Sequence, residues 1–208
     1  MSAMKGAIVT APGKTTIFDD VLAFPQYRSP EDPLATREDG QKELACLGDA
    51  LEAAQPGDVV GVDVGGVEFI NYSFSDECFG NLAGRLQSGE HPERFVVLIA
   101  PKKDMENGLQ DIVVALKNRK LAMLWAEDGD ASEYDVVGEL SEALRETLRA
   151  VEPGDTNDVL AEKLKIKSTA CINRTDKLTK MRLLRKKLHA GEYGYKQYEF
   201  APVLPASG

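Results

Sequence analysis

The chain has 208 residues, of which 43% are hydrophobic and 28% charged, and its mean hydropathy is −0.28. These values are typical of a soluble folded protein and exclude a disordered chain and a membrane protein. Charge is distributed unevenly, because residues 1–150 carry a net charge of −13 and residues 151–208 a net charge of +4, which together give −9. We therefore expect two units with different electrostatic partners.

The cysteines and histidines give no sign of a metal site. Cys46, Cys78 and Cys171 are far apart and lack the paired spacing of zinc ligands. Only His91 and His189 could assist them. We therefore expect no metal, no disulfide framework and no cofactor.

The N-terminal residues, MSAMKGAIVTAPGK, lack the apolar run of about 7–15 residues that a secretory signal needs. Nowhere do about 18 apolar residues follow one another, as a membrane-spanning helix requires. We therefore expect a cytoplasmic protein with no membrane partner.

In the first unit, residues 1–152, strands and helices are predicted to alternate. Short apolar runs predict strands at 58–64, 95–100, 121–125 and 134–140. Apolar residues at helical spacing predict helices at 36–54, 75–88, 105–119 and 141–151, and Thr36 with Asp39 resembles a capping box. Prolines break the apolar runs of 4–35, which favours edge strands or a loop there. This order predicts an α/β fold with a mainly parallel or mixed sheet covered by helices.

A second unit, residues 153–208, follows the break Glu152-Pro153-Gly154-Asp155. Asp155, Thr156 or Asn157 can cap a helix that ends at the Lys165-Ile166-Lys167 turn. A second helix is expected from Ser168 or Thr169 to about Met181, with Cys171, Thr175 and Leu178 on its buried face. Two short strands, Leu183–Leu188 and Gln197–Phe200, then flank a turn.

The segment LAEKLKIKSTACINRTDKLTKMRLLRKK resembles the winged helix-turn-helix family. The matching positions are Leu164 and Ile166 before the turn, Ala170, Asn173-Arg174 in the second helix, Leu178, and Leu183-Leu184-Arg185 at the start of the wing. Arg182 departs from the pattern, because many members have Gly at the end of this helix, so the turn must be made without an easy left-handed residue. The resemblance implies a small C-terminal winged helix domain that binds duplex DNA.

A basic surface in this unit supports DNA binding independently, since residues 160–200 carry a net charge of +7. The candidate DNA-binding residues are Thr169, Asn173, Arg174, Lys177, Lys180, Arg185, Lys186, Lys187 and Lys196. Asn173 and Arg174 could contact adenine or guanine, or could instead bind phosphate or cap a turn. Tyr193, Tyr195 and Tyr198 are expected to pack across the hairpin. Winged helices also serve as protein-binding modules, and basic residues on a helix often only solvate its outer face.

The stretch GDVVGVDVGGVEFINYSFSDECFGNLAGRL, preceded by Thr36-Arg37 at the start of a helix, resembles the STAS and STAS-like families. These domains are named after sulfate transporters and anti-sigma factor antagonists. The matching residues are Asp63-Val64 at a strand end, Gly66-Val67 in a turn, Phe69-Ile70, and Ser73-Phe74 before Asp76-Glu77. The resemblance covers roughly 36–150 and implies a signalling or protein-interaction domain, with a kinase or a sigma-factor regulator as candidate partner.

Ser73 matches the serine that is phosphorylated in anti-sigma factor antagonists, and the resemblance therefore makes it a candidate phosphoswitch. Asn71, Tyr72 and Phe74 replace the Asp, Ser and Gly of the family step. The alternative is a helix N-cap, in which Ser73 accepts a hydrogen bond from the amide of Asp76. We favour the cap, because Tyr72 and Phe74 are bulky neighbours of the hydroxyl.

No catalytic motif is complete. Residues 11–16 (APGKTT) hint at a phosphate loop, but Ile8 stands where the Walker pattern needs Gly. Neither histidine belongs to a nucleophile motif, and Asp63 is expected to bond a turn amide. We predict that the protein is not an enzyme.

The sequence thus predicts a DNA-binding transcriptional regulator in which a STAS-like domain receives a signal or protein partner and a winged helix binds duplex DNA. The alternative is a signalling adaptor whose winged helix contacts protein. A homodimer is compatible with either function.

Overall fold

The computed structural model describes residues 20–23, 36–65, 67, 70–106, 109–127, 134–190 and 196–204, without the side chains of residues 20–23, 105, 189, 190 and 196. Most of the predicted N-terminal edge region and the loop of residues 11–16 lie outside the described residues. Gly66, Phe69, Tyr193 and Tyr195 lie outside them as well.

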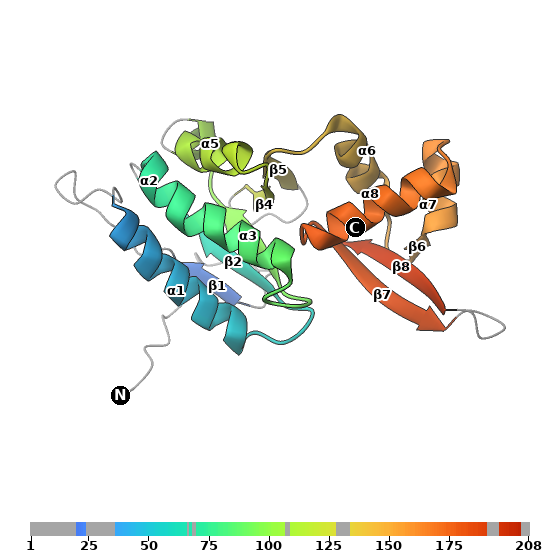
Figure 1. Ribbon diagram of the computed structural model, residues 1–208, viewed down its shortest axis with the longest axis horizontal. Helices are drawn as coiled ribbons and strands as arrows, with labels where there is room; N and C mark the ends of the chain where they lie inside the picture. Colours follow the sequence, from blue (N-terminus) through green and yellow to red (C-terminus); the bar gives the residue numbers. More distant parts are fainter. Residues whose placement is uncertain are drawn as a thin grey trace, which may run out of the picture.

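A five-stranded mixed sheet organises the first part of the chain (Figure 1). Its strands, in spatial order, are β1 (Asp20–Ala23), β2 (Val59–Asp63), β3 (Phe95–Ile99), β4 (Ala122–Ala126) and β5 (Tyr134–Gly138). The first four strands are parallel, and β5 pairs antiparallel with β4. The prediction of an α/β fold with a mixed sheet is confirmed, and β1 is an edge strand inside the proline-rich region.

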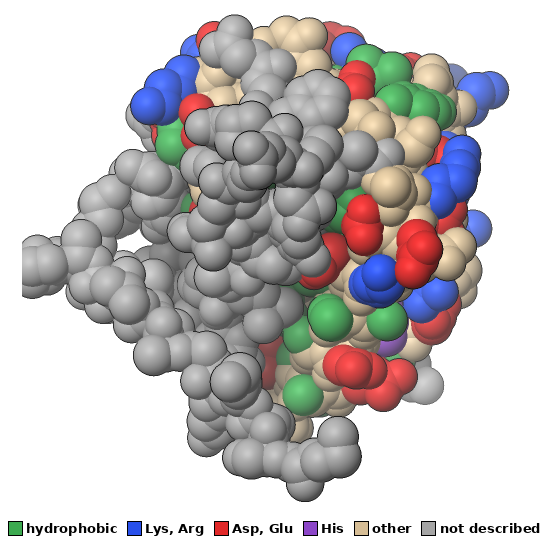
Figure 2. Space-filling model, turned by 90° about the vertical axis from the view of Figure 1, so that its left-hand side faces the viewer, with side chains coloured by type: hydrophobic (Ala, Val, Ile, Leu, Met, Phe, Trp, Pro, Cys, Tyr) green, Lys and Arg blue, Asp and Glu red, His purple; other side chains and the backbone are tan. Residues whose placement is uncertain are grey.

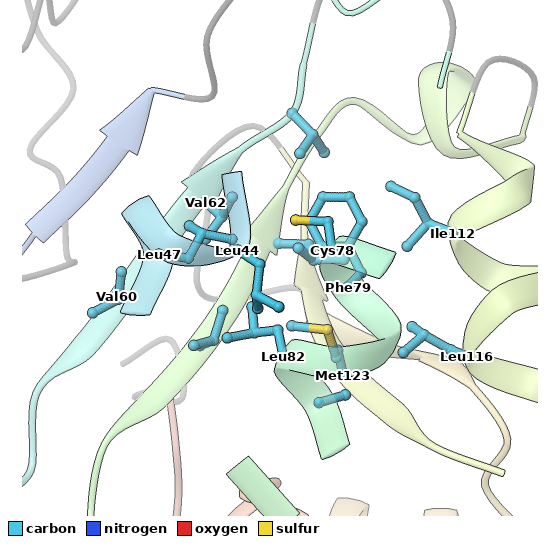
Figure 3. Packing of buried hydrophobic residues seen from close by; sticks show 14 of the residues in the cluster. Leu44, Leu47, Val60, Val62, Cys78, Phe79, Leu82, Ile112, Leu116 and Met123 are labelled. Atoms are coloured by element: carbon cyan, nitrogen blue, oxygen red, sulfur yellow. The ribbon is translucent and has the colours of Figure 1, made fainter. Parts of the chain in front are cut away.

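The helices of this part are α1 (Arg37–Ala53), α2 (Tyr72–Ser75), the π-helix η1 (Asp76–Gly80), α3 (Asn81–Ser88), α4 (Lys102–Glu106) and α5 (Gln110–Asn118). Strands β1 to β4 lie in chain order, so right-handed crossovers place their connecting helices on the same face of the sheet. Figure 3 shows side chains of α1, η1, α3 and α5 meeting Val60, Val62 and Met123 of the sheet. The first hydrophobic core therefore lies between this helical layer and one face of the sheet.

The second face of the sheet belongs to another apolar cluster, because successive strand residues point to opposite sides. Val59, Val97 and Leu124 are buried in that cluster. The same cluster continues into C-terminal residues such as Leu184 and Phe200. The two parts of the chain therefore share a continuous hydrophobic core.

The C-terminal elements are α6 (Glu142–Ala150), β6 (Asp155–Thr156), α7 (Asn157–Leu164), α8 (Ser168–Lys180), β7 (Leu184–Ala190) and β8 (Lys196–Pro202). The three strands form an antiparallel sheet of order β6-β8-β7. Helices α7 and α8 and both hairpin strands lie where the sequence predicts them. Among the three candidate caps of α7, Thr156 accepts from the amide of Val159 at 3.4 Å.

Helix α6 packs against α7 and α8, and its Leu144 and Leu148 join the cluster that contains Cys171 and Leu178 of α8. The boundary predicted near residue 153 assigns this helix to the first unit, whereas in space it lies with the C-terminal elements. Periodicity predicts the helix but not the surface that it covers.

Arg182 ends α8 in the left-handed region, with φ 59°. The amide of Leu183 donates to the carbonyl of Leu178 at 3.0 Å, which closes the helix in the way a C-terminal glycine usually does. The expectation that this turn is made without glycine is confirmed. No helix in the described part of the chain is both long and apolar enough to cross a membrane.

Candidate functional site

The outer face of α8 carries four of the predicted DNA-binding residues. Thr169, Asn173, Lys177 and Lys180 are all exposed and lie within one arc of the helix. Cys171, Thr175 and Leu178 are completely buried on the opposite side, as predicted. This arrangement presents two ammonium groups, an amide and a hydroxyl to the outside.

Arg174 does not share that outer face. Its Nη1 donates to Glu146 Oε2 at 3.2 Å and to Thr147 Oγ1 at 3.3 Å, both on α6. Thr147 is fully buried, and only 22% of the Arg174 side chain is exposed. The expectation that Arg174 lies outside is wrong, because the side chain holds α8 against α6.

Arg185 is also engaged within the molecule. Its Nη1 donates to the carbonyl of Gly57 at 2.6 Å, and its Nε donates to the carbonyl of Val203 at 3.1 Å. The guanidinium carbon lies 4.7 Å from the ring centroid of Phe95. These contacts join β7 to the end of the large sheet where β2 and β3 begin, and they disfavour a role for Arg185 in DNA binding.

The remaining basic candidates lie on the hairpin. Lys186 Nζ pairs with Asp176 Oδ1 of α8 at 2.8 Å and lies 4.1 Å from the ring centroid of Tyr198. Lys187 is exposed. The side chain of Lys196 lies outside the described residues. Lys187 and the outer face of α8 are therefore exposed, whereas Lys186 holds the hairpin against α8.

Four large apolar side chains of the described C-terminal elements are exposed, which was not predicted. Val159 of α7 is 42%, Ile172 41%, Leu188 49% and Tyr198 45% exposed. Leu188 and Tyr198 are cross-strand partners, in accord with the expected hairpin packing of the tyrosine. Ile172 lies one turn before Asp176 on α8, so its outward position could have been read from the helical spacing.

The predicted N-cap role of Ser73 is wrong. The helix begins at Tyr72, and Asn71 is its cap, with Oδ1 accepting from the amide of Phe74 at 2.9 Å. The backbone of Asn71 is extended, as is typical of a residue that caps a helix. Ser73 lies inside the helix, because its carbonyl accepts a hydrogen bond from the amide of Asp76. The helix starts one turn earlier than the apolar spacing indicates, so Ser73 lies in its first turn and is half-buried.

The π-helix η1 was not predicted, and such turns are often found at functional sites. Its Asp76 is 9% exposed and accepts from Arg119 Nε at 2.6 Å, while Arg37 Nη1 lies 3.5 Å away. The hydrogen bond from Arg119 lowers the pKa of Asp76. Figure 2 looks at the end of the molecule where α1 and α2 begin, and its described surface mixes acidic and basic side chains.

Two glycines allow this polar cluster to form. A Cβ at Gly40 would lie 2.9 Å from Glu77 Cβ, so its absence lets α1 approach the π-helix closely. A Cβ at Gly80 would lie 2.8 Å from Arg119 Nε. At Gly40 the neighbouring atoms include the backbone oxygen of Phe74, so this glycine is required, whereas at Gly80 a Cβ would displace only the flexible side chain of Arg119.

Three further residues that could take part in catalysis or bind a metal, Asp63, His91 and Cys78, lie in surroundings that do not favour such a role. Asp63 Oδ1 accepts from the amide of Gly65 at 2.9 Å, which confirms the predicted turn bond. His91 is 6% exposed, and its Nε2 has no hydrogen-bond partner among the described residues. Burial raises the pKa of the Cys78 thiol, which disfavours the reactive thiolate. Within the described ranges, no group of three His, Cys, Asp or Glu side chains could hold a metal ion.

Comparisons with protein-family models, with curated proteins and with solved structures find no match to this chain. Any function must therefore be argued from the geometry of the chain itself.

Proposed function

We propose that the protein is a DNA-binding transcriptional regulator in which a C-terminal winged helix binds duplex DNA and a STAS-like α/β unit receives a signal or a protein partner. The observation that carries the proposal is the order α6, β6, α7, α8, β7, β8 around a small sheet of order β6-β8-β7. Helix, strand, two helices and a hairpin in this order are the plan of a winged helix-turn-helix, in which the last helix enters the major groove.

The side chains on the outer face of α8 suit this role. Lys177 and Lys180 offer charge to phosphates, and Asn173 offers an amide that can bond the edge of adenine. No described residue forms an ion pair with either lysine, so both ammonium groups are available to a ligand. Lys187 on β7 extends the basic surface to the hairpin.

The signalling role of the first unit rests on its resemblance to STAS-like domains, together with a sheet covered by helices on one face. A kinase or a sigma-factor regulator remains the proposed partner. Ser73 remains the candidate phosphorylation site, and because Asn71 provides the cap, a phosphate on Ser73 would leave the capping bond in place.

Titration of the full chain with duplex DNA across a salt series tests the proposal. Each phosphate contact contributes a slope of about −0.9 to the plot of log K against log salt. Lys177→Ala and Lys180→Ala should each flatten that slope, whereas Asn173→Ala should weaken binding to a preferred sequence only. Lys117→Ala, an exposed lysine of α5, is the matched control and should change nothing. Absence of salt-dependent binding would reject the proposal.

One observation favours the second candidate, a signalling adaptor whose winged helix contacts protein. Ile172, Leu188 and Tyr198 expose apolar surface on α8 and the hairpin, and the ion pair with Asp176 engages Lys186, one of the predicted DNA-binding residues. If this function is correct, Ile172→Ala and Tyr198→Ala should disrupt a protein complex, and wild type and Lys177→Ala should show the same negligible DNA affinity.

A further inference from the structure

A shallow hollow of about 380 Å³, open to solvent, lies between α3 and the end of α5. It is lined by Asn81, Gly84, Arg85, Ser88 and Arg119. None of these residues lies on α8 or β7, and none was predicted to bind a ligand. The lining contains two guanidinium groups and no carboxylate.

Arg119 is fixed in place before any ligand arrives. Its Nε is bonded to Asp76 Oδ1 and its Nη1 to Asn81 Oδ1, both at 2.6 Å. Nη2 has no hydrogen-bond partner among the described residues and can still donate twice. Because the missing Cβ of Gly80 leaves room for this guanidinium, the chain holds a preorganised donor at the edge of the hollow.

The opposite wall is one face of α3, where Asn81, Gly84, Arg85 and Ser88 recur at helical spacing. Arg85 pairs only loosely with Glu90, at 3.6 Å, and both side chains are more than two-fifths exposed. Gly84 leaves the floor open, since a Cβ there would meet only Leu121 Cδ1, at 3.9 Å. A ligand can therefore approach the helix backbone between the two arginines.

We infer that this hollow binds the phosphate group of a small molecule. Guanidinium groups bind phosphate oxygens in pairs of parallel hydrogen bonds, and a phosphate has enough oxygens to engage Arg85 and Arg119 together. A carboxylate carries less negative charge and fewer acceptor oxygens than a phosphate, so it gains less from two arginines. The volume left beyond the phosphate accommodates the rest of a small phosphorylated molecule.

Calorimetric titration of the full chain with inorganic phosphate, at constant ionic strength kept with chloride, tests this site. Saturable binding is expected, and acetate should bind at least about tenfold more weakly because it carries less negative charge and fewer acceptor oxygens than phosphate. Arg85→Gln should weaken phosphate binding by about tenfold or more. Wild-type protein that shows no saturable binding, or that binds acetate as tightly as phosphate, would overturn the inference.

A second variant removes no charge. Gly84→Leu fills the floor of the hollow and should abolish phosphate binding, while leucine favours the helix over glycine. Gly48→Leu in α1 is its matched control, since a Cβ there meets nothing within 4 Å, and it should bind phosphate like wild type. Equal binding by both variants would contradict the site. The assay contains no DNA, so its outcome is independent of the proposed DNA-binding function.

Discussion

The two parts of the molecule use their charged side chains differently. On the helical layer of the first part, Arg37 and Arg119 are paired with Asp76 and Glu77 of the π-helix. On α8, Lys177 and Lys180 form no ion pair with any described residue. Charge in the first part therefore holds elements together, whereas the lysines of α8 are presented to the outside.

The same contrast separates arginine from lysine within the C-terminal elements. Arg174 bridges α8 to α6, and Arg185 bridges β7 to the large sheet. A guanidinium has five donors in a rigid plane and can bond several acceptors, whereas an ammonium group remains strongly hydrated. A count of basic residues treats both types alike, which explains why the two arginines were predicted to bind DNA.

Removal of the arginine that holds the π-helix should have the largest effect on stability. Arg119→Ala leaves Asp76 nearly buried without its main partner and should lower the free energy of unfolding by about 2 kcal/mol. Urea denaturation measures the change. Arg149→Ala, an arginine that is 67% exposed on α6, serves as control and should stay within about 0.5 kcal/mol of wild type. Equal effects would show that the cluster does not hold the fold.

The pH dependence of stability should identify Asp76 as a charged partner. Because Arg119 lowers the pKa of Asp76 below its ordinary value of 3.8, the carboxylate stabilises the folded state above that pH. This contribution is lost as the pH falls through the lowered pKa. Urea midpoints of wild type and Asp76→Asn should therefore differ above pH 3.8 and converge in stronger acid. If the two urea midpoints differ by the same amount at every pH, the stability lost in Asp76→Asn comes from packing and not from the charge of Asp76.

Arg185→Lys sharpens the contrast between the two basic residue types. The substitution keeps the charge but loses the fork that bonds Gly57 and Val203, and should cost about 1–2 kcal/mol of stability. The salt dependence of DNA binding should be unchanged. A stability within about 0.5 kcal/mol of wild type would show that this fork does not hold β7 in place.

The smallest expected effect on stability concerns the residue that caps α2. Asn71→Ala should destabilise the protein by about 1 kcal/mol, because it removes the acceptor for the amide of Phe74. Ser73→Ala should change stability by less than about 0.5 kcal/mol. Thermal or urea unfolding of the two variants compares them directly, and the reverse order would restore Ser73 as the cap.

The parts of the fold with a strong local pattern could be predicted from the sequence. Continuous apolar runs predicted β2 and β3, and alternation with helices predicted the mixed sheet. Strand β6 has only two residues, too few for any periodicity. The π-helix η1 has only five residues, too few to show a spacing different from that of the α-helices on either side. Asn71 and Ser73 are both capping residues, and periodicity does not fix a helix start to within one turn.

The candidate site could be predicted only where a single helix determines it. The spacing within α8 correctly placed Thr169, Asn173, Lys177 and Lys180 outside. Arg174 was misplaced because its partners, Glu146 and Thr147, belong to α6, and the contact of Arg185 with Gly57 also comes from a distant segment. The hollow proposed to bind phosphate likewise joins α3 to Arg119, which no local pattern relates.

The central claim, that the lysines of α8 contact DNA while its arginine holds the fold, is tested most directly by two variants of neighbouring turns. Duplex DNA titrations across a salt series should show that Lys177→Ala flattens the slope of log K against log salt by about 0.9. Arg174→Ala should keep the wild-type slope and lower the urea midpoint. A slope that Arg174→Ala flattens as much as Lys177→Ala, or that neither variant changes, would contradict the claim.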